Sequence, residues 1–391
     1  MPNLTDSISR SEGARSLFRL LRLALWLGIA GFGGGFAIVQ QTRRILVERE
    51  RRLSEEDFLE SFAVATALPG TPGTNLLTIM GVRLGGVPGG LLTTAVFLVP
   101  SVLVMIGFAA IYDSLRHIST LGTFLDGMSL ATVGVVASVA ADIGRSSLKR
   151  RIDWALALMG ALALILHALT LLEVIAISGL CGALCLRPER TSDSSPSAPR
   201  SSKLGMLLPL PLAAITASPI AVLFVVFARI GLATFGGGFS MIPAIEHEIV
   251  TTEHWLTNSA FNDAIVLGQI TPGPVAIAAT FIGYRVSGLL GALSATVGMF
   301  TPPMVLSLFA GRSLKAFHTN PLVQGALHGI TPALAGILAA AAVALWRTSA
   351  HGVAGAIVAL AATVILIRWR IFPLFVLVAG GLAMLASAPL K

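Results

Sequence analysis

The chain has 391 residues, of which 55% are hydrophobic and 12% are charged. This composition excludes a soluble multidomain protein and a disordered chain, and it is typical of a polytopic membrane protein. The formal net charge of +8 does not indicate nucleic-acid binding, because the basic residues cluster in short loops between apolar runs, as positive-inside anchoring requires. We therefore expect an all-α integral membrane protein that lies in the lipid bilayer and binds no nucleic acid.

The first half of the chain contains six apolar segments. They are residues 23–39, 62–80, 91–112, 124–143, 154–171 and 174–186. Several reach the ~20 residues that cross a bilayer, and the last two are short enough to pair as a hairpin. The basic first 30 residues show no clear cleavage site for a signal peptide, so the first apolar segment is expected to remain in the protein.

A charged stretch rich in serine and proline follows at residues 187–205. Its composition predicts a flexible, hydrophilic linker on the cytoplasmic side. The second half again has six apolar segments, at residues 220–241, 264–282, 289–310, 322–346, 353–367 and 372–385. The sequence therefore predicts two membrane domains, residues 1–186 and 206–391, with about five to six membrane segments each.

The two halves share a pattern of glycines and prolines. The motif Phe-Gly-Gly-Gly-Phe occurs at residues 32–36 and 235–239, and a Pro-Gly pair follows at Pro69 and at Pro272. The offset is 203 residues in both cases (235 − 32 and 272 − 69). Gly-x-Arg motifs and single prolines match as well, at an offset of 202: Gly81 to Arg83 with Gly283 to Arg285, and Pro100 with Pro302. The halves are thus predicted to be repeats of one structural unit.

Loop charges orient the two halves. The loop after the first glycine motif carries five arginines, whereas the second half has no Lys or Arg between Arg229 and Arg285. Conversely, Arg312 and Lys315 exceed the lone Arg116 of the matching first-half loop. By the positive-inside rule the halves point in opposite directions across the membrane, which predicts an inverted-topology repeat. Alternating access is then expected to rock one half against the other.

The topology of two segments does not follow from charge alone. The basic N-terminus and the basic loop at residues 43–52 are separated by a single apolar segment, residues 23–39. Either this segment dips into the membrane and returns, or the N-terminus goes against its charge. Residues 62–80 start and finish on one side, which predicts a re-entrant hairpin. The exact number of spans stays open.

The glycine triplets and Pro-Gly pairs interrupt helices where lipid offers the backbone no water, so they must face protein or a polar cavity. Two such breaks at equivalent places predict the substrate site of a transporter. Pro72 and Pro274 suit the first position of half-helices, and the free N–H groups that follow form an anion site without a charged side chain. In the alternative interpretation, the glycines only allow close helix packing and the prolines only kink helices.

The predicted substrate-binding residues come from both halves. They are Gly33, Gly34, Gly35, Pro69, Gly70, Thr71, Asn75, Arg229, Gly236, Gly237, Gly238, Gln269, Thr271, Pro272, Gly273 and Pro274. Arg229 is included because an arginine inside an apolar run is costly and therefore indicates function. It is expected to attract the anion or to pair with a carboxylate such as Asp263; the alternative is that it reaches the membrane interface.

Four further charges are candidates for substrate access or for coupling. Arg83 and Arg285 end the Pro-Gly segments, where they could attract anions or anchor the protein at the interface. Glu60 and Asp263 occupy equivalent positions, where carboxylates could carry protons in a coupled cycle. The alternative for Glu60 and Asp263 is helix capping in a solvated loop.

Other chemistry finds little support in the sequence. The His and Glu residues between Glu246 and His254 lack the spacing of a zinc-binding helix, and a solvated acidic loop is favoured. Cys181 and Cys185 are interpreted as packing residues. The sequence predicts no catalytic residue, no metal and no cofactor, and hence no enzyme.

The order and spacing of these motifs resemble the chromate transporter (CHR) family. The second half resembles it through Phe235-Gly-Gly-Gly with Pro243, Trp255-Leu-Thr, Gln269-Ile-Thr-Pro-Gly-Pro274 and Gly283-Tyr-Arg-Val-Ser-Gly288. The first half does so through Phe32-Gly-Gly-Gly, Leu68-Pro-Gly-Thr71 and Gly81-Val-Arg-Leu-Gly85. It departs from the family pattern at Thr71, where proline is usual, and at Trp26, where a basic residue is common.

The resemblance covers nearly the whole chain, as in the long, two-domain members of the family. It implies a multi-pass protein of the bacterial cytoplasmic membrane that exports chromate as an antiporter driven by the proton-motive force, with sulfate as a structural analogue. Two alternatives remain: a transporter or channel for sulfate or another small anion, and a membrane-embedded enzyme. The stoichiometry of coupling and the oligomeric state, including a homodimer, stay open.

Overall fold

A computed structural model describes residues 4–32, 34–50, 53–185, 218–236, 238–311, 321–349, 352–369 and 371–387. Every regular element formed by these residues is a helix, which confirms the predicted all-α class. Gly33 and Gly237 of the predicted site lie outside the described residues, as do the predicted linker at residues 187–205 and the orienting residues Arg312 and Lys315.

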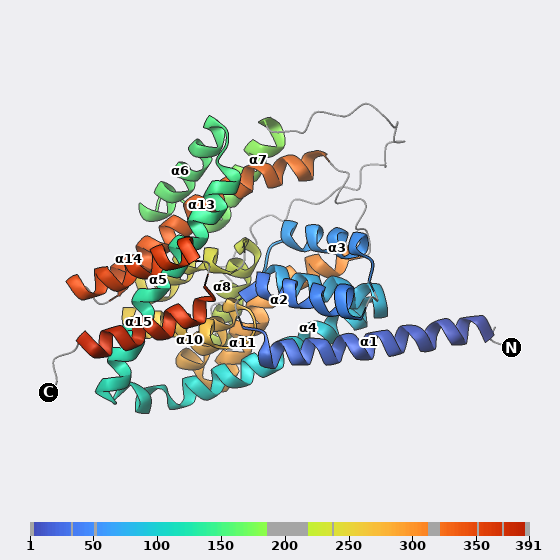
Figure 1. Cartoon of the computed structure of the whole chain (residues 1–391), viewed down its shortest axis with the longest axis horizontal. Helices are drawn as coiled ribbons and strands as arrows, with labels where there is room; N and C mark the ends of the chain where they lie inside the picture. Colours follow the sequence, from blue (N-terminus) through green and yellow to red (C-terminus); the bar gives the residue numbers. More distant parts are fainter. Residues whose placement is uncertain are drawn as a thin grey trace.

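The described residues of the first half form seven α-helices, and two of the interruptions between them fall where they are predicted (Figure 1). The elements are α1 (Leu4–Ala30), α2 (Gly34–Arg43), η1 (Arg44–Arg49), α3 (Glu55–Ala67), α4 (Pro72–Arg116), α5 (Ser119–Ser147), α6 (Arg151–Ile165) and α7 (Leu171–Cys185). The glycine motif separates α1 from α2, and the Pro-Gly pair separates α3 from α4. A third interruption bends α4 at Gly85 and Gly86.

The second half repeats this order. Its elements are α8 (Pro219–Ala233), η3 (Phe239–Met241), α9 (Ile242–Glu246), η4 (His247–Thr252), α10 (Asn258–Ile270), η5 (Val275–Ile277), α11 (Ala278–Ala310), α13 (Pro321–Thr348), α14 (Val353–Trp369) and α15 (Pro373–Ser387). Local details return as well, since Ser54 and Thr257 cap equivalent helices and α11 bends at Ser287 and Gly288. The structure therefore confirms that the halves are repeats.

The first four helices form two hairpins, α1 with α2 and α3 with the start of α4, and the open ends of these hairpins lie together. Arg43 Nε donates to Glu55 Oε1 at 2.8 Å, which joins the end of α2 to the start of α3. Arg83 Nη2 donates to Asp57 Oδ1 at 2.7 Å, which joins the start of α3 to the bend of α4. Leu17 of α1 packs at the same bend. The glycine break between α1 and α2 and the Pro-Gly break between α3 and α4 consequently lie at the other end of these hairpins. We call these turns the hairpin tips. The apolar segment at residues 23–39 thus turns back at the break, and the predicted hairpin at residues 62–80 is present.

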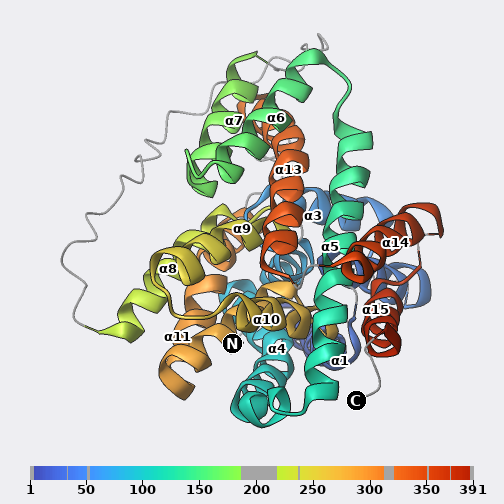
Figure 2. The same cartoon turned by 90° about the vertical axis from the view of Figure 1, so that its left-hand side faces the viewer.

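The last two helices of each half are exchanged. The hairpin of α6 and α7 packs on α13 of the second half, and the hairpin of α14 and α15 packs on α5 of the first (Figure 2). Glycines allow this close approach: Gly336 of α13 faces the carbonyl of Ala157, and Gly127 of α5 faces the carbonyl of Gly380. The sequence halves are therefore interlocked.

This packing predicts a large difference between two glycine variants. In Gly336→Val, the new side chain would overlap the Ala157 carbonyl and push α6 away from α13, which costs about 1–3 kcal/mol or more. Gly107→Val serves as the control, because a Cβ at Gly107 of α4 meets no atom within 4 Å. We expect a lowered Tm of the purified protein for Gly336→Val only. Equal Tm values for the two variants would show that the exchanged hairpins do not depend on this contact.

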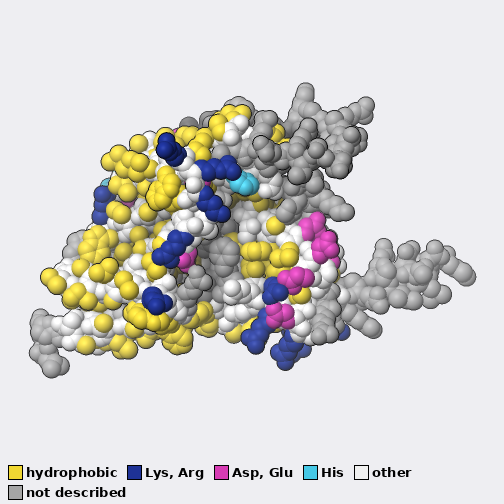
Figure 3. Space-filling view, turned by 45° about the horizontal axis from the view of Figure 1, so that its top comes forward, with side chains coloured by type: hydrophobic (Ala, Val, Ile, Leu, Met, Phe, Trp, Pro, Cys, Tyr) yellow, Lys and Arg dark blue, Asp and Glu magenta, His cyan; other side chains and the backbone are white. Residues whose placement is uncertain are grey.

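Four helices of the described residues are long and apolar enough to cross a membrane: α4, α5, the continuous η5–α11 segment and α13. Shorter apolar helices, among them α7, α8, α14 and α15, surround them. Hydrophobic side chains also cover much of one outer face, and the charged side chains on that face gather in a few places (Figure 3). The protein is a polytopic helical membrane protein.

Candidate functional site

The hairpin tips of the two halves meet and are joined by reciprocal hydrogen bonds. The N–H of Gly70 donates to the carbonyl of Thr234 at 2.6 Å, and the N–H of Gly273 donates to the carbonyl of Gly31 at 2.9 Å. Gly70 and Gly273 are equivalent in the repeat, and so are Gly31 and Thr234. The Pro-Gly loop of each half is thus tied to the glycine break of the other half.

Both Pro-Gly loops need glycine for two reasons. Gly70 has φ of 100° and Gly273 has φ of 109°, a left-handed conformation that other residues rarely adopt. A Cβ on Gly70 would lie 2.5 Å from Cβ of Pro303, and a Cβ on Gly273 would overlap Oγ of Ser101. The Ser101 hydroxyl also donates to the Pro272 carbonyl at 2.6 Å. Each tip is therefore fixed in position by the other half of the chain.

A half-helix begins after each Pro-Gly loop, and its first backbone N–H groups have no acceptor among the described residues. Pro72 is the first residue of α4, as predicted, and the N–H groups of Gly73 and Thr74 meet no acceptor among the described residues. In the second half, Pro274 comes just before the 3₁₀ turn η5, and the N–H groups of Val275 and Ala276 likewise have no acceptor in the described part of the chain. All four residues are buried, so these amides are available to a water molecule or a solute that reaches the site.

The glycine motifs leave room in front of these amides. A Cβ on Gly35 would lie 3.4 Å from the amide nitrogen of Gly73, and one on Gly238 would lie 3.7 Å from that of Ala276. The Gly238 position is also 3.4 Å from Cγ2 of Thr71, so the two tips are close to each other. The predicted residues Gly35, Gly238 and Thr71 are thus brought together with both half-helix starts. Gly34 begins α2, and Gly236, with φ of 70°, faces Leu334 of α13.

The predicted polar side chains hold the tips in shape. Asn75 Nδ2 donates to the carbonyls of Pro69 at 2.8 Å and of Ala65 at 3.1 Å, and so closes the first loop. Thr271 Oγ1 donates to the carbonyl of Leu267 at 2.7 Å, and Gln269 Nε2 donates to Thr132 Oγ1 at 3.0 Å. The side-chain donors of Asn75 and Thr271 are thus used to hold the loops, and Gln269 binds α5.

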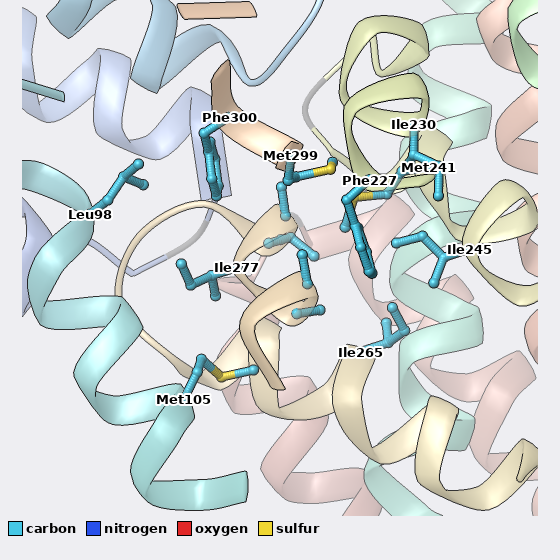
Figure 4. Packing of buried hydrophobic residues seen from close by; sticks show 14 of the residues in the cluster. Leu98, Met105, Phe227, Ile230, Met241, Ile245, Ile265, Ile277, Met299 and Phe300 are labelled. Carbon is cyan, nitrogen blue, oxygen red and sulfur yellow. The ribbon is translucent and has the colours of Figure 1, made fainter. Parts of the chain in front are cut away.

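Apolar side chains surround the Pro-Gly loop of the second half, which we call the second tip. Met105 of α4, Phe227 of α8, Ile265 of α10 and Met299 of α11 are buried around the loop that leads to Ile277 (Figure 4). An amide that donates to an anion in such a medium of low dielectric contributes more than it would in water. The tips therefore combine free donors with exclusion of water.

Arg229 lies on α8 one turn before the second break and lines a different pocket. This pocket, with a volume of about 160 Å³, lies between α8, α9 and the α6–α7 turn. Glu173 of α7 and His247 of η4 also line it. Asp263 is paired elsewhere, which excludes it as the partner of Arg229. The pocket reaches Ala233 at the end of α8, so Arg229 faces a space beside the second tip rather than the tip itself.

A pair of charge variants tests the role of Arg229. If it draws the anion toward the second tip, Arg229→Gln removes a charge-assisted contact worth about 1.5–3 kcal/mol, and the KM for the transported anion rises at least about tenfold. Glu173→Gln is the matched control, because it removes a negative charge from the same pocket and should lower KM. The measurement is initial flux into proteoliposomes. An unchanged KM in Arg229→Gln would remove Arg229 from the site.

Of the four access and coupling candidates, three form exposed or half-buried ion pairs. Arg83 binds Asp57 and lies 3.9 Å from Glu60, while Arg285 Nη1 binds Asp113 Oδ2 at 2.8 Å. Hydrogen bonds from the Ser54 hydroxyl and from Arg83 lower the pKa of Asp57, so this pair stays charged at neutral pH. Neither Glu60 nor Asp263 caps a helix, since the capping residues are Ser54 and Thr257; the capping interpretation is wrong.

Asp263 is the exception among these carboxylates because it is buried, with only 1% of its surface exposed. The Tyr112 hydroxyl donates to its Oδ2 at 2.6 Å, and Arg116 Nε lies 3.5 Å from the same oxygen. Tyr112 and Arg116 could not be recognised as its partners from the sequence, because 151 residues separate Tyr112 from Asp263. Asp263 is therefore a buried carboxylate that is held between a hydroxyl group and a cation.

Comparisons with known proteins agree with this architecture. A family model described as "Chromate transporter" matches residues 18–184 and again residues 221–385. A "Probable chromate transport protein" of Synechococcus elongatus is 29% identical over 355 residues, which cover 89% of each chain. The "Chromate transport protein" of Pseudomonas aeruginosa is 30% identical over 84% of this chain and 81% of its own, and that of Cupriavidus metallidurans is 27% identical over 94% and 92%. No solved structure matches the chain significantly.

Proposed function

The chain belongs to the chromate transporter family, and we propose from this that it exports chromate from the bacterial cytoplasm across the inner membrane, in exchange for protons. The family match covers both repeats, so the transport role applies to the whole chain. The energy source and the direction are inferences from the resemblance and from the buried carboxylate Asp263.

The observation that carries this proposal is the set of four unpaired amides at the two tips. Chromate is a tetrahedral dianion whose oxygens each accept hydrogen bonds. The N–H groups of Gly73, Thr74, Val275 and Ala276 provide such donors at the positive ends of two half-helix dipoles. Neutral donors bind the anion without a fixed positive charge, so the site can release it at the end of the cycle. Sulfate has the same shape and charge, and the same donors favour it as the second candidate substrate.

The membrane orientation follows from charge and tip geometry. The basic loops at residues 43–52 and 145–151 place the open ends of the first-half hairpins in the cytoplasm. The second-half hairpins meet them tip to tip, so they enter from the other side and the anion site lies near the middle of the bilayer. In this arrangement the repeats at residues 1–186 and 206–391 are inverted, and residues 187–205 link them in the cytoplasm.

The packing favours moving parts other than the two sequence halves. The exchange of α6–α7 and α14–α15 interlocks the sequence halves, so rocking one half against the other would separate packed helices. We infer instead that the bundle carrying the tips, α1–α4 and α8–α11, moves against the outer helices α5–α7 and α13–α15. The most extensive helix contacts fall within these groups, between α8 and α11, α1 and α4, α4 and α11, and α13 and its neighbours α5–α7, whereas the short helices α9 and α10 also touch α13 and α5.

Flux into proteoliposomes tests the proposed function. The purified protein is reconstituted with labelled chromate or labelled sulfate, with and without an imposed proton gradient. A chromate exporter is expected to accumulate chromate against its gradient when protons flow the opposite way, and cells that express it should contain less chromate. Flux that only follows the concentration gradient of the anion would indicate a passive anion channel. Faster flux of sulfate than of chromate would identify sulfate as the substrate. The absence of any anion flux would contradict transport.

A further inference from the structure

A polar chamber lies where the ends of α4 and α13 meet α5 and the start of α10. Its volume is about 300 Å³, and each residue that lines it has a polar side chain, in a chain that is 55% hydrophobic. Three of these side chains are more than nine-tenths buried: Ser129 at 3%, Asn262 at 4% and Ser349 at 6% exposure. Buried polar groups are costly inside a membrane protein, and so such a cluster indicates a function.

The chamber is fixed in shape and presents hydrogen-bond donors. The Ser129 and Ser349 hydroxyls are 3.1 Å apart, and Thr348 Oγ1 donates to Asn262 Oδ1 at 2.8 Å. This bond orients the Asn262 amide, whose Nδ2 has no acceptor within the described ranges. Ser259 accepts a hydrogen bond from Arg116, which leaves its own hydroxyl hydrogen to donate. Both donors suit an oxyanion.

Arg116 connects the chamber to the buried carboxylate. Its Nη2 binds Asp126 Oδ1 at 2.9 Å, and its Nε lies 3.5 Å from Asp263 Oδ2. An anion in the chamber therefore competes with Asp263 for the guanidinium. When Asp263 takes up a proton, Arg116 loses part of its counter-charge and is available to the anion.

A polar seam leads from the chamber toward the second tip. On α5, Asp126, Ser129 and Thr132 follow one another at intervals of three residues, which places them along one side of the helix. On α10, Asn262 and Gln269 are seven residues apart and also share a face. The hydrogen bond between Gln269 and Thr132 closes the inner end of the seam, two residues before Thr271 of the tip.

The repeat supplies a counterpart at the opposite ends of α5 and α13. This second chamber, of about 420 Å³, is lined by Ser146, Ser147 and Thr331, which are equivalent to Thr348, Ser349 and Ser129. Lys149 and Arg150, which belong to the basic loop at residues 145–151, also line it. Asp153 lines it as well, and its Oδ2 accepts hydrogen bonds from the backbone N–H groups of Lys149 and Arg150. Three residues beyond Thr331 on α13, the Leu334 side chain lies 3.3 Å from a Cβ position on Gly236 of the second break.

We propose that the two chambers are the outer and inner mouths of the anion path, and that each binds the transported oxyanion before or after it reaches the tips. The assignment rests on the proposed function, which defines what moves along the path. The Arg116 chamber faces outward and the Lys149 chamber faces the cytoplasm. The cations of both chambers, together with the Asn262 amide and the Ser259 hydroxyl of the Arg116 chamber, favour dianions over neutral and cationic solutes.

Thiol reagents of opposite charge test this proposal without measuring transport. Cys181 and Cys185 are replaced by serine, and Asn262→Cys or Thr331→Cys is introduced. Each variant reacts with an anionic sulfonatoethyl and a cationic trimethylammonioethyl methanethiosulfonate, and each rate is divided by that of a free thiol. We expect Asn262→Cys to react from outside intact cells and Thr331→Cys only in everted vesicles. The anionic reagent should be favoured about tenfold at both positions, and sulfate should slow both reactions.

Matched variants make the outcome decisive. Leu59→Cys occupies the position on α3 equivalent to Asn262, is 49% exposed and lines neither chamber, so it should show no preference for the anionic reagent. Adding Arg116→Gln to Asn262→Cys should abolish the preference there. Ser349→Cys replaces Asn262→Cys if the latter does not fold. Equal ratios at Asn262→Cys and Leu59→Cys in a protein that transports chromate would overturn the chambers alone. Selective labelling in a protein without anion flux would overturn the proposed function alone.

Discussion

Replacing Gly273 with alanine is expected to abolish chromate transport while the protein still inserts and folds. Gly273 has φ of 109°, and its missing side chain gives room to Oγ of Ser101. Alanine adds about 1–2 kcal/mol of backbone strain and about 1–3 kcal/mol of overlap, which together displace the tip. The displacement also breaks the bond from Gly273 to Gly31 and moves the Val275 and Ala276 amides out of position. Gly70→Ala should act in the same way through Pro303.

The control for this experiment is Gly288→Ala. Gly288 has φ of 59°, so alanine is strained there too, but a Cβ at this position meets no atom within 4 Å. Both variants place alanine at a positive φ and so carry backbone strain. Only Gly273→Ala also brings a Cβ atom into overlap with Ser101 at the tip. Transport is measured as initial chromate flux into proteoliposomes at matched protein content. If Gly273→Ala transports as well as Gly288→Ala, the tips do not form the binding site.

Asp263→Asn is expected to separate chromate movement from proton movement. Asparagine keeps an oxygen that accepts the Tyr112 hydrogen bond, but it cannot take up or release a proton. Accumulation driven by a proton gradient should therefore be lost, whereas exchange of labelled for unlabelled chromate continues at the intact tips. Without a carboxylate beside it, Arg116 should also hold the anion more tightly, which lowers KM.

The equivalent residue of the first half is the control for Asp263. Glu60 has a side chain that is 27% exposed and lies 3.9 Å from Arg83, so it is solvated and weakly paired. Glu60→Gln should keep proton-driven accumulation. Both variants are assayed with and without the gradient in the same liposome preparation. Accumulation by Asp263→Asn at the rate of the wild type would assign the coupling to another group.

The elements that were predictable from the sequence are those with a local chemical cause. Gly70 and Pro72 break the helix because of their own backbone chemistry, so the Pro-Gly break between α3 and α4 could be located without a structure. The repeat was also visible, because its two copies keep the spacing of these residues. The opposite orientation of the halves, which was inferred from the loop charges, stays a prediction.

The contacts between distant segments could not be predicted in this way. Apolar helices in lipid choose partners by the shape of small residues, and nothing in the sequence around Gly336 specifies that α6 packs there. Likewise, Asp263 is identified as buried only when Tyr112 and Arg116 are seen beside it. Nothing in the sequence specifies that the Asn75 amide closes the loop through Pro69, and its predicted part in substrate binding stays a prediction.

The most direct test of the account is to locate chromium in the protein. Crystals grown with chromate and measured at the chromium absorption edge give the position of the bound anion. We expect a peak at the tips, with chromate oxygens about 2.7–3.2 Å from amide nitrogens among Gly73, Thr74, Val275 and Ala276. Chromium bound only in the pocket of Arg229, with no anion at these amides, would contradict the claim that the hairpin tips form the transport site.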